Sequence, residues 1–480
     1  MNWGEIKKRK MPVAIVLIVV TFLVYIPFFI FFLNVREDQL KNGEEPKTVL
    51  PVYGSDSIGY GILGNAILHK GVFSTSNESP YKPDTFRTPG YPLLLVAFIF
   101  LFGSYTFFPI VQILFVIGTA WLIFKIGLKL FSFWVGLIAA LFFIIDPAVI
   151  LHTLLILSDI TFTFFLILSV YLMFFYEKKN PWIFFLSGLS LAVATYIRPI
   201  AMFVPFVILP FYLYLNWSHQ WKTLLRNAGL FVAALILILS PWVVRNKIVS
   251  NTWGLSSVQS FNFFFYTMPE FLSFKEKVSP DDIRKKFFEE MAVKGVKPED
   301  FSDLSVTSKM NEISYPYLKS NLPSYAVWHA VKMTPFFFSS GIKNFFYVYD
   351  DMIHYKAYET SNSNLTNFLM RGQFKNFFNV IKGQALITIE QLFWVFVFIL
   401  MFVPLWIKEK RFYTLLLLAL IFYLALPTVP VAYSRFRIPA APFMFILAVE
   451  GFLILLYALK RTNIIHELQN RLQASQNVIK

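Results

Sequence analysis

The chain has 480 residues, of which 57% are hydrophobic and only 15% are charged, and it contains no cysteine. Soluble domains are nearer half apolar and a quarter charged, so this composition excludes an ordinary soluble protein and indicates a polytopic helical membrane protein. The lack of cysteine excludes disulfides, thiol catalysis and Cys-ligated zinc or iron–sulfur sites. The net charge of +15 is compatible with nucleic-acid binding, but most basic residues lie at the ends of apolar runs. We therefore expect the lipid bilayer, and no nucleic acid, as a partner.

The first apolar run, Met11–Leu33, follows the basic cluster Lys7-Lys8-Arg9-Lys10. It is long for a signal-peptide core and has no small-residue cleavage site, so we interpret it as a retained first span that begins in the cytoplasm. The loop 34–106 then lies outside and carries a short helical pattern that starts near Asp56.

The next apolar run, Pro89–Phe102, is shorter than the roughly 20 residues that crossing a bilayer requires. If it crossed, Lys125, Lys129 and every later basic loop would lie outside, against the positive-inside rule. We therefore predict a re-entrant or interfacial helix here.

All basic clusters fall inside if the remaining apolar runs cross in turn. These predicted spans are Phe107–Phe124, Trp134–Leu151, Asp159–Tyr176, Trp182–Tyr196, Ile200–Leu215, Ala228–Val244, Leu386–Trp406, Tyr413–Pro430 and Ile438–Leu459. The predicted fold class is an all-α polytopic membrane protein, a transmembrane bundle of about 10–11 spans with extracytoplasmic loops that carry short interfacial helices.

The predicted organisation has four parts. Residues 1–247 form an N-terminal transmembrane core with the external loop 34–106, residues 248–385 an extracytoplasmic region, residues 386–460 the C-terminal transmembrane helices, and residues 461–480 a cytoplasmic tail. Within the extracytoplasmic region, Ser279-Pro280 is typical of a helix start, and Tyr325–Phe338 is typical of an interfacial segment. We expect no strong independent domain there.

Several charged residues fall at the outer ends of predicted spans, where charge is costly and favours a functional interpretation. They are Asp56, Arg87, Asp159, Arg198, Arg245, Arg435 and Arg437.

Each acidic residue has two interpretations. Asp56 follows a Gly-Ser turn before an apolar-periodic run, which suits a helix N-cap or a general base that takes a proton from an acceptor hydroxyl. Asp159, after Ser158, is either a cap or a second acidic group that orients the acceptor. With Asp146 and His152 nearby, a divalent metal ion is an open alternative, although a His–Asp pair is a weak metal signal.

The arginines are either interfacial anchors or contacts to a lipid phosphate, for which the planar guanidinium fork is suited. Arg87 precedes the corner Pro89-Gly-Tyr-Pro92. Arg198, Arg245, Arg435 and Arg437 are candidates for the same phosphate, but Arg435 and Arg437 alternate, so we expect one of the two to face the site. The remaining candidate substrate contacts are Tyr53, Tyr60, Tyr91 and His152.

The nucleotide and hydrolase motifs are missing. The sequence has no G-x-x-x-x-G-K-[ST], no G-x-G-x-x-G after a strand, no H-E-x-x-H and no G-x-S-x-G. ATP-driven transport, dinucleotide chemistry, zinc proteolysis and α/β-hydrolase chemistry therefore have no support.

The order of landmarks resembles a known superfamily. An acidic residue follows the first span (Tyr53-Gly-Ser-Asp56), a basic-x-Pro-x-Tyr-Pro corner opens an apolar helix (Arg87 to Gly103), and Leu157-Ser-Asp159 precedes a later span. An Arg198-Pro pair, a Pro241-Trp-Val-Val-Arg-Asn segment and a Ser434-Arg-Phe-Arg-Ile-Pro segment follow. Across about Met11–Leu459 the chain resembles the GT-C superfamily of polyprenyl-phosphate-sugar-dependent glycosyltransferases, with the lipid A aminoarabinose transferases and the protein O-mannosyltransferases most similar in pattern.

The resemblance implies a polyprenyl-phosphate-linked sugar donor, a hydroxyl-bearing acceptor, and a site on the extracytoplasmic side of the plasma (inner) membrane. Asp56 matches the catalytic base, Asp159 the second acidic residue and Arg87 the basic residue before the proline corner. The chain departs from the paired acidic residues of protein O-mannosyltransferases, since Ser57 follows Asp56, and it shows no large C-terminal soluble domain. The acceptor therefore stays open.

Two other functions remain as alternatives. A transporter or flippase of lipid-linked sugars favours inverted repeats and charges at mid-membrane. A ligase that uses a pyrophosphate-linked donor, as O-antigen ligases do, would place its catalytic groups in the late loop, where His329, Asp350-Asp351, His354 and Arg371 are candidates.

Overall fold

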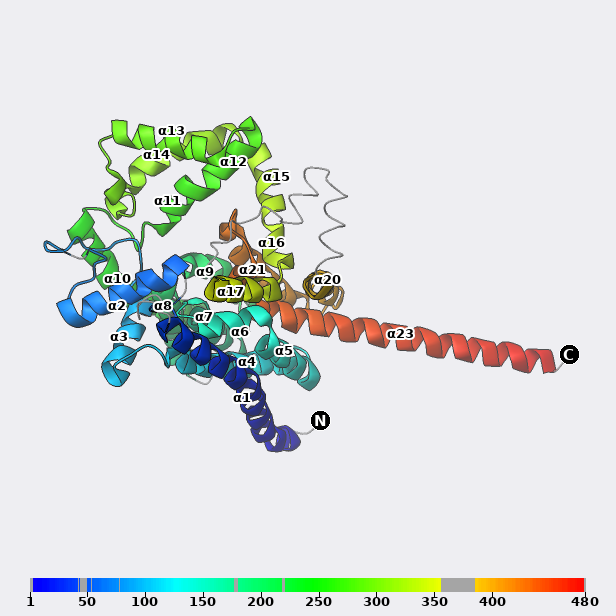
Figure 1. Cartoon of the computed structure of the whole chain (residues 1–480). Coiled ribbons are helices and arrows are strands. Elements are labelled where there is room, and N and C mark those ends of the chain that lie inside the picture. Colours follow the sequence, from blue (N-terminus) through cyan, green and yellow to red (C-terminus); the bar gives the residue numbers. More distant parts are fainter. Residues whose placement is uncertain are drawn as a thin grey trace.

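The structure is a computed structural model. It describes residues 3–41, 43, 50–52, 54–76, 78–176, 180–217, 221–354 and 385–478, and the side chains of all of these except 3–11, 349–354 and 461–478. Throughout these ranges the secondary structure is helical, without strands, which confirms the predicted all-α membrane fold (Figure 1).

Within the described residues, six helical segments are long and apolar enough to cross a membrane, and each lies on a predicted span. They are Pro12–Lys41 in α1 (Trp3–Lys41), α4 (Phe108–Leu130), α10 (Trp221–Ser250), Ala385–Trp406 with α20 (Ala385–Leu400), Arg411–Thr428 with α21 (Arg411–Ala425), and Ala441–Lys460 in α23 (Ala441–Val478). Helix α23 continues the last predicted span through most of the predicted tail, and Figure 1 shows it projecting far from the bundle.

The predicted span Trp134–Leu151 is broken. Helices α5 (Phe133–Ile145) and α6 (Pro147–Leu154) meet at a 53° bend. Asp146 lies at this bend with extended backbone, and its Oδ1 accepts a hydrogen bond from the Ala148 N–H at 2.9 Å. An Asp followed by Pro is the usual start of a new helix, so the break follows from these two residues.

Shorter apolar helices complete the bundle. They are α3 (Gly90–Phe102), α7 (Asp159–Val170) with the π-helical turn η1 (Tyr171–Phe175), α8 (Trp182–Ile197), and η2 (Pro199–Phe203) with α9 (Val204–Leu215). Each coincides with a predicted element. At 13 residues, α3 extends only about 20 Å, which is less than the ~30 Å hydrocarbon core.

Exposed tryptophans flank the turns that the sequence predicts to be cytoplasmic. Trp134 lies in the first turn of α5, Trp182 begins α8, Trp217 follows α9, Trp221 begins α10, and Trp406 follows α20. Tryptophan favours the membrane–water interface. Its positions therefore agree with the basic residues Lys129, Lys222 and Lys410 at the same turns.

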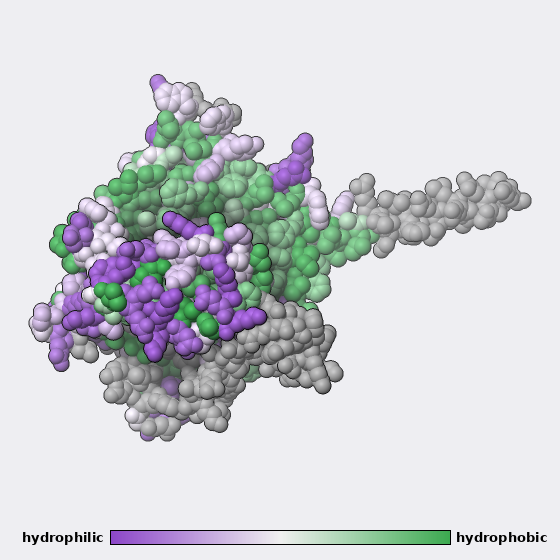
Figure 2. Space-filling model, turned by 90° about the horizontal axis from the view of Figure 1, so that it is seen from above, coloured by the Kyte–Doolittle hydropathy of each residue, from purple (hydrophilic) through white to green (hydrophobic). Residues whose placement is uncertain are grey.

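The region that the sequence predicts to be extracytoplasmic has its own apolar core, which the sequence did not lead us to expect. Helices α11 (Val258–Asn262), α12 (Met268–Glu276), α13 (Pro280–Val293) and α14 (Thr307–Ser320), with the π-helical turn η3 (Phe263–Thr267), bury a cluster that includes Phe264, Phe287 and Met310. We call residues 251–320 the outer subdomain. The predicted cap is confirmed, because Ser279 Oγ accepts from the Asp281 N–H. Seen from above, hydrophilic residues gather over this subdomain while apolar surface flanks the bundle behind it (Figure 2).

Below the outer subdomain, α15 (Leu322–Lys332) and α16 (Thr334–Phe338) lead to α17 (Gly341–His354). Helix α17 lies on α6, and its first backbone N–H groups, Gly341 and Ile342, donate to the carboxylate of Glu390 in α20, each at 2.9 Å. One buried carboxylate thus caps a helix of the outer layer from inside the bundle. A separate hydrogen bond, from Asn344 Nδ2 to Ser434 Oγ at 2.7 Å, links α17 to α22 (Ser434–Arg437), which carries Arg435.

Candidate active site

Asp56 lies in the first turn of α2 (Gly54–Lys70) and forms ion pairs with two arginines. Its Oδ1 accepts from Arg87 Nη2 at 3.2 Å, and its Oδ2 contacts Arg435 Nη2 at 2.9 Å. The Asp56 side chain is 41% exposed, so it is open to an incoming molecule. Among the described residues no backbone N–H donates to this carboxylate, so the N-cap interpretation finds no support in the geometry.

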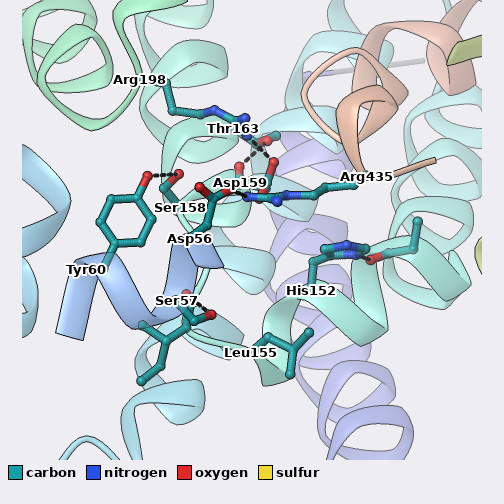
Figure 3. Close-up of polar contacts among 12 residues, drawn as sticks. Asp56, Ser57, Tyr60, His152, Leu155, Ser158, Asp159, Thr163, Arg198 and Arg435 are labelled. Atoms are coloured by element: carbon teal, nitrogen blue, oxygen red, sulfur yellow. Dashed lines mark hydrogen bonds and ion pairs between the residues drawn. The ribbon is translucent and has the colours of Figure 1, made fainter. Parts of the chain in front are cut away.

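Asp159 begins α7 and is fully buried. Arg435 Nε donates to its Oδ2 at 2.9 Å, and Arg198, which ends α8, donates to its Oδ1. Arg435 therefore bridges the two carboxylates with one guanidinium, as Figure 3 shows, with Asp159 on the buried side and Asp56 on the open side.

Hydrogen bonds between α2 and the start of α7 hold the two carboxylates together. The Tyr60 hydroxyl lies 3.1 Å from Ser158 Oγ, and Ser57 Oγ donates to the Ile156 carbonyl at 2.8 Å (Figure 3). The Arg87 guanidinium lies over the Tyr60 ring, 4.4 Å from its centroid. This stacking adds a cation–π attraction to the ion pair with Asp56.

Two glycines leave the space that this packing needs. A Cβ at Gly59 would lie 2.8 Å from Arg87 Nη2, and a Cβ at Gly90 would lie 2.7 Å from the backbone carbon of Tyr196. Gly59 keeps the Arg87 guanidinium against α2, and Gly90 lets α3 approach the end of α8 beside Arg198. Gly90 belongs to the predicted corner Pro89-Gly-Tyr-Pro92, whereas Gly59 was not among the predicted site residues.

The cluster is positively charged. Two carboxylates face three guanidinium groups, which leaves one positive charge in excess. Partial burial raises the pKa of Asp56, but the guanidinium groups of Arg435, Arg87 and Arg198 outweigh it and hold that pKa below its usual value. Such a cluster attracts an anion, and phosphate suits the arginine forks.

The two other predicted arginines lie apart from the carboxylates. Arg245 in α10 donates from Nη1 to the Asp84 carbonyl at 2.6 Å. Arg437 is fully buried 3.5 Å from the Trp394 ring centroid and donates to the carbonyls of Phe336 and Phe337, each at 3.1 Å. Both arginines donate hydrogen bonds to backbone carbonyls instead of facing Asp56 and Asp159. As the alternation indicated, Arg435 faces the cluster and Arg437 does not.

The remaining candidates occupy the margins of the cluster. The buried Tyr91 ring packs edge-on against Tyr60, with the centroids 4.7 Å apart. His152 is buried, and its Nδ1 is paired with the Ala148 carbonyl of its own helix at 2.7 Å (Figure 3). Tyr53 lies outside the described residues.

The donor set at this site does not fit a divalent cation. Hard cations take six or more oxygen ligands from carboxylates, carbonyls and water, whereas Asp56 and Asp159 already face guanidinium groups. Across the described residues no group of three or more His, Asp or Glu side chains is placed to hold a metal. The chemistry proposed for this cluster therefore involves no metal ion.

The late-loop candidates do not join the cluster where they are described. His329 in α15 pairs with the Leu426 carbonyl through Nε2 at 2.9 Å and with the Tyr325 hydroxyl through Nδ1 at 3.1 Å. Arg371 and the side chains of Asp350, Asp351 and His354 lie outside the described residues.

Comparison with known proteins gives one family match. Residues 86–244 match the family model described as dolichyl-phosphate-mannose-protein mannosyltransferase. That segment contains Arg87, Asp159 and Arg198 of the cluster but neither Asp56 nor Arg435. No curated protein matches the chain.

Among solved structures, the chain is similar to the archaeal oligosaccharyltransferase AglB from Archaeoglobus fulgidus, in complex with an inhibitory peptide and a dolichol-phosphate. The sequence identity is 11% and the TM-score 0.49, with 97% of this chain and 52% of that chain covered. The chain therefore spans about half the length of that protein. The resemblance to membrane glycosyltransferases that the sequence indicated is thus confirmed by the family match over residues 86–244.

Proposed function

We propose that the protein is an integral-membrane glycosyltransferase that moves a sugar from a polyprenyl-phosphate donor to a hydroxyl acceptor, with Asp56 as the general base. The observation that carries the proposal is the pairing of a partly exposed carboxylate, Asp56, with Arg87 and Arg435, and of Arg435 and Arg198 with the buried Asp159. The family match over residues 86–244 supports the donor class.

The arginines hold the phosphate of the donor. Arg87 and Arg435 each present a guanidinium to the open side of the cluster, where Asp56 is their partner in the structure. The excess positive charge of the cluster attracts the phosphodiester of the donor. It also stabilises the negative charge that grows on the leaving phosphate in the transition state.

Donor binding also activates the base. In the structure Asp56 is a weak base because two arginines pair with it and lower its pKa. The donor phosphate competes with Asp56 for Arg87 Nη2 and Arg435 Nη2, while the buried Asp159 keeps Arg435 Nε in place. As the arginines turn to the phosphate, Asp56 loses its partners and its affinity for a proton increases.

The chemical step is a single displacement. The acceptor oxygen attacks the anomeric carbon and forms the new glycosidic bond, its proton passes to Asp56, and the bond between the anomeric carbon and the phosphate oxygen breaks. The polyprenyl phosphate leaves with the electron pair and needs little protonation, so one carboxylate suffices. Attack opposite the leaving group inverts the anomeric configuration.

The finer assignments belong to the same proposal. The transferred unit is a hexosyl or pentosyl group, and the acceptor is a lipid, glycan or protein hydroxyl. The site faces the extracytoplasmic side of the plasma (inner) membrane, an orientation that the basic residues at the opposite helix ends support.

The test is a transfer assay with the purified full-length chain in nanodiscs, using labelled polyprenyl-phosphate sugars and an extract of cell-envelope acceptors. General-base catalysis contributes about 10²–10⁴-fold, so Asp56→Asn should lower turnover by that factor. Glu299→Gln, at an exposed carboxylate of the outer subdomain, is the matched control and should keep full turnover. Wild-type turnover in Asp56→Asn would overturn the assignment of the base.

A further inference from the structure

The segment 82–87, which ends at Arg87, is attached to the outer subdomain by contacts over long sequence distances. Thr85 Oγ1 accepts from the Leu304 N–H at 2.8 Å, and the Thr85 carbonyl accepts from the Ser257 N–H at 3.1 Å. Ser256 Oγ donates to the Phe86 carbonyl. Thr85 is only 3% exposed, so its bonds are shielded from water. Hydrogen bonds from the outer subdomain therefore fix the backbone directly before Arg87.

The same segment is held from the membrane side. Arg245 Nη1 donates to the Asp84 carbonyl at 2.6 Å, and Arg245 Nη2 donates to the Phe73 carbonyl at 3.4 Å. The Asp84 carboxylate in turn accepts from the N–H groups of Phe86 at 3.1 Å and Arg87 at 2.9 Å. The backbone of Arg87 is thus fixed on one side by α10 and on the other by the outer subdomain.

We propose that Thr85 is a positioning residue, through which the outer subdomain sets the placement of the Arg87 guanidinium at the donor phosphate. This inference rests on the proposed function, since it assumes that Arg87 binds the donor. An arginine side chain has many rotamers. A fixed backbone and the narrow space over Gly59 limit them, and together with the Tyr60 ring they keep the Arg87 guanidinium at Asp56. A displacement of about 1 Å at such a site is costly for catalysis.

Another contact between the same two parts provides a control. Lys82 Nζ lies 2.5 Å from Asp300 and 3.5 Å from Asp303, but these side chains are partly exposed. Exposed ion pairs contribute little, whereas a buried backbone N–H that loses its acceptor is costly. Thr85→Val, which keeps the shape of the side chain, should therefore have a larger effect than Lys82→Gln.

The experiment measures donor KM and kcat of the full-length chain in nanodiscs with a polyprenyl-phosphate sugar. Thr85→Val should raise donor KM about five- to tenfold, which corresponds to the free energy of one buried hydrogen bond. Thr85→Ser and Lys82→Gln should behave as the wild type. In an Arg87→Gln background, Thr85→Val should cause no further change in donor KM, because the group that it positions is already gone. If Thr85→Val does not fold, Ser256→Ala removes a neighbouring contact from the outer subdomain and should give the same pattern.

The outcomes separate the two proposals. A wild-type donor KM in both Thr85→Val and Ser256→Ala, or an equal loss in the presence and absence of the Arg87 guanidinium, would overturn the positioning role. If Arg87→Gln alone left donor KM and turnover unchanged, the donor role of Arg87 in the proposed function would fail instead.

Discussion

Arg435 donates from Nε to Asp159 at 2.9 Å, across 276 positions of sequence. The carboxylate is fully buried and the arginine is 8% exposed. An ion pair of this kind pays a large desolvation penalty, and it persists here because Arg198 and Arg435 both satisfy Asp159. The ion pair with Asp159 therefore fixes the guanidinium of Arg435, whose Nη2 contacts Asp56.

Replacing Asp159 should destabilise the protein. In Asp159→Asn two arginines lose their shared buried partner, and breaking a buried pair costs about 3–5 kcal/mol. Thermal unfolding of the purified protein in detergent should show a clear decrease in melting temperature. Glu312→Gln, at an exposed pair with Lys294, should leave the melting temperature unchanged. Equal stability of Asp159→Asn and the wild type would contradict the anchoring role.

Replacing Asp56 should separate donor binding from turnover. In the structure Asp56 pairs with Arg87 and Arg435, the two arginines that hold the donor phosphate in the proposed function. Asp56→Asn removes the charge that competes with this phosphate, so donor affinity should rise while turnover falls. Equilibrium binding of a non-transferable donor analogue measures the first effect. A weaker affinity in Asp56→Asn would mean that the carboxylate helps to hold the donor and does not compete with it.

His329 should make the protein less stable in mild acid. Burial lowers the pKa of His329 below 6.5, although the contact with the Leu426 carbonyl raises it. Below pH 6.5 the unfolded chain therefore binds a proton before the folded chain does, and stability falls as the pH drops through this region. Melting temperatures between pH 7 and pH 5 should fall in the wild type and fall less in His329→Gln. A parallel decrease in both proteins would show that other groups are responsible.

The chain is suited to a topology test because it has no cysteine. Lys222→Cys, at an exposed position beside Trp221, should be protected from a membrane-impermeant maleimide in intact cells, and Lys285→Cys on the outer subdomain should be labelled. Both should react after the membrane is permeabilised. Labelling of Lys222→Cys in intact cells would reverse the predicted orientation.

Much of the helical bundle could be predicted from the sequence, because the length of each apolar run is a local property of the chain. Every predicted span coincides with helix, and the short run Pro89–Phe102 became a separate short helix. The bend at Asp146-Pro147 also had a local signal, an N-cap residue before proline, which the span assignment did not use. The outer subdomain was missed because several short helices share its core, and each contributes only a few buried residues, such as Ile283, Phe287 and Met291 of α13.

Most residues of the site could be predicted from the sequence, but the contacts between them could not. The predicted charged residues were Asp56, Asp159, Arg87, Arg198, Arg245, Arg435 and Arg437, and the structure brings all of these together except Arg245 and Arg437. Whether a given arginine meets a carboxylate or a carbonyl is decided by tertiary packing, so no local pattern could separate Arg198 from Arg245. The alternation of Arg435 and Arg437 was the exception, since a two-residue spacing places the two side chains on different sides.

The assembly of the site from distant segments has a consequence for biosynthesis. Asp56, Arg87, Asp159 and Arg198 are synthesised early, whereas Arg435 is added only after most of the chain. Until then the Asp159 carboxylate lacks one of its two guanidinium partners. A nascent chain, or a product truncated before Ser434, therefore lacks Arg435 and cannot hold the complete cluster of two carboxylates and three arginines.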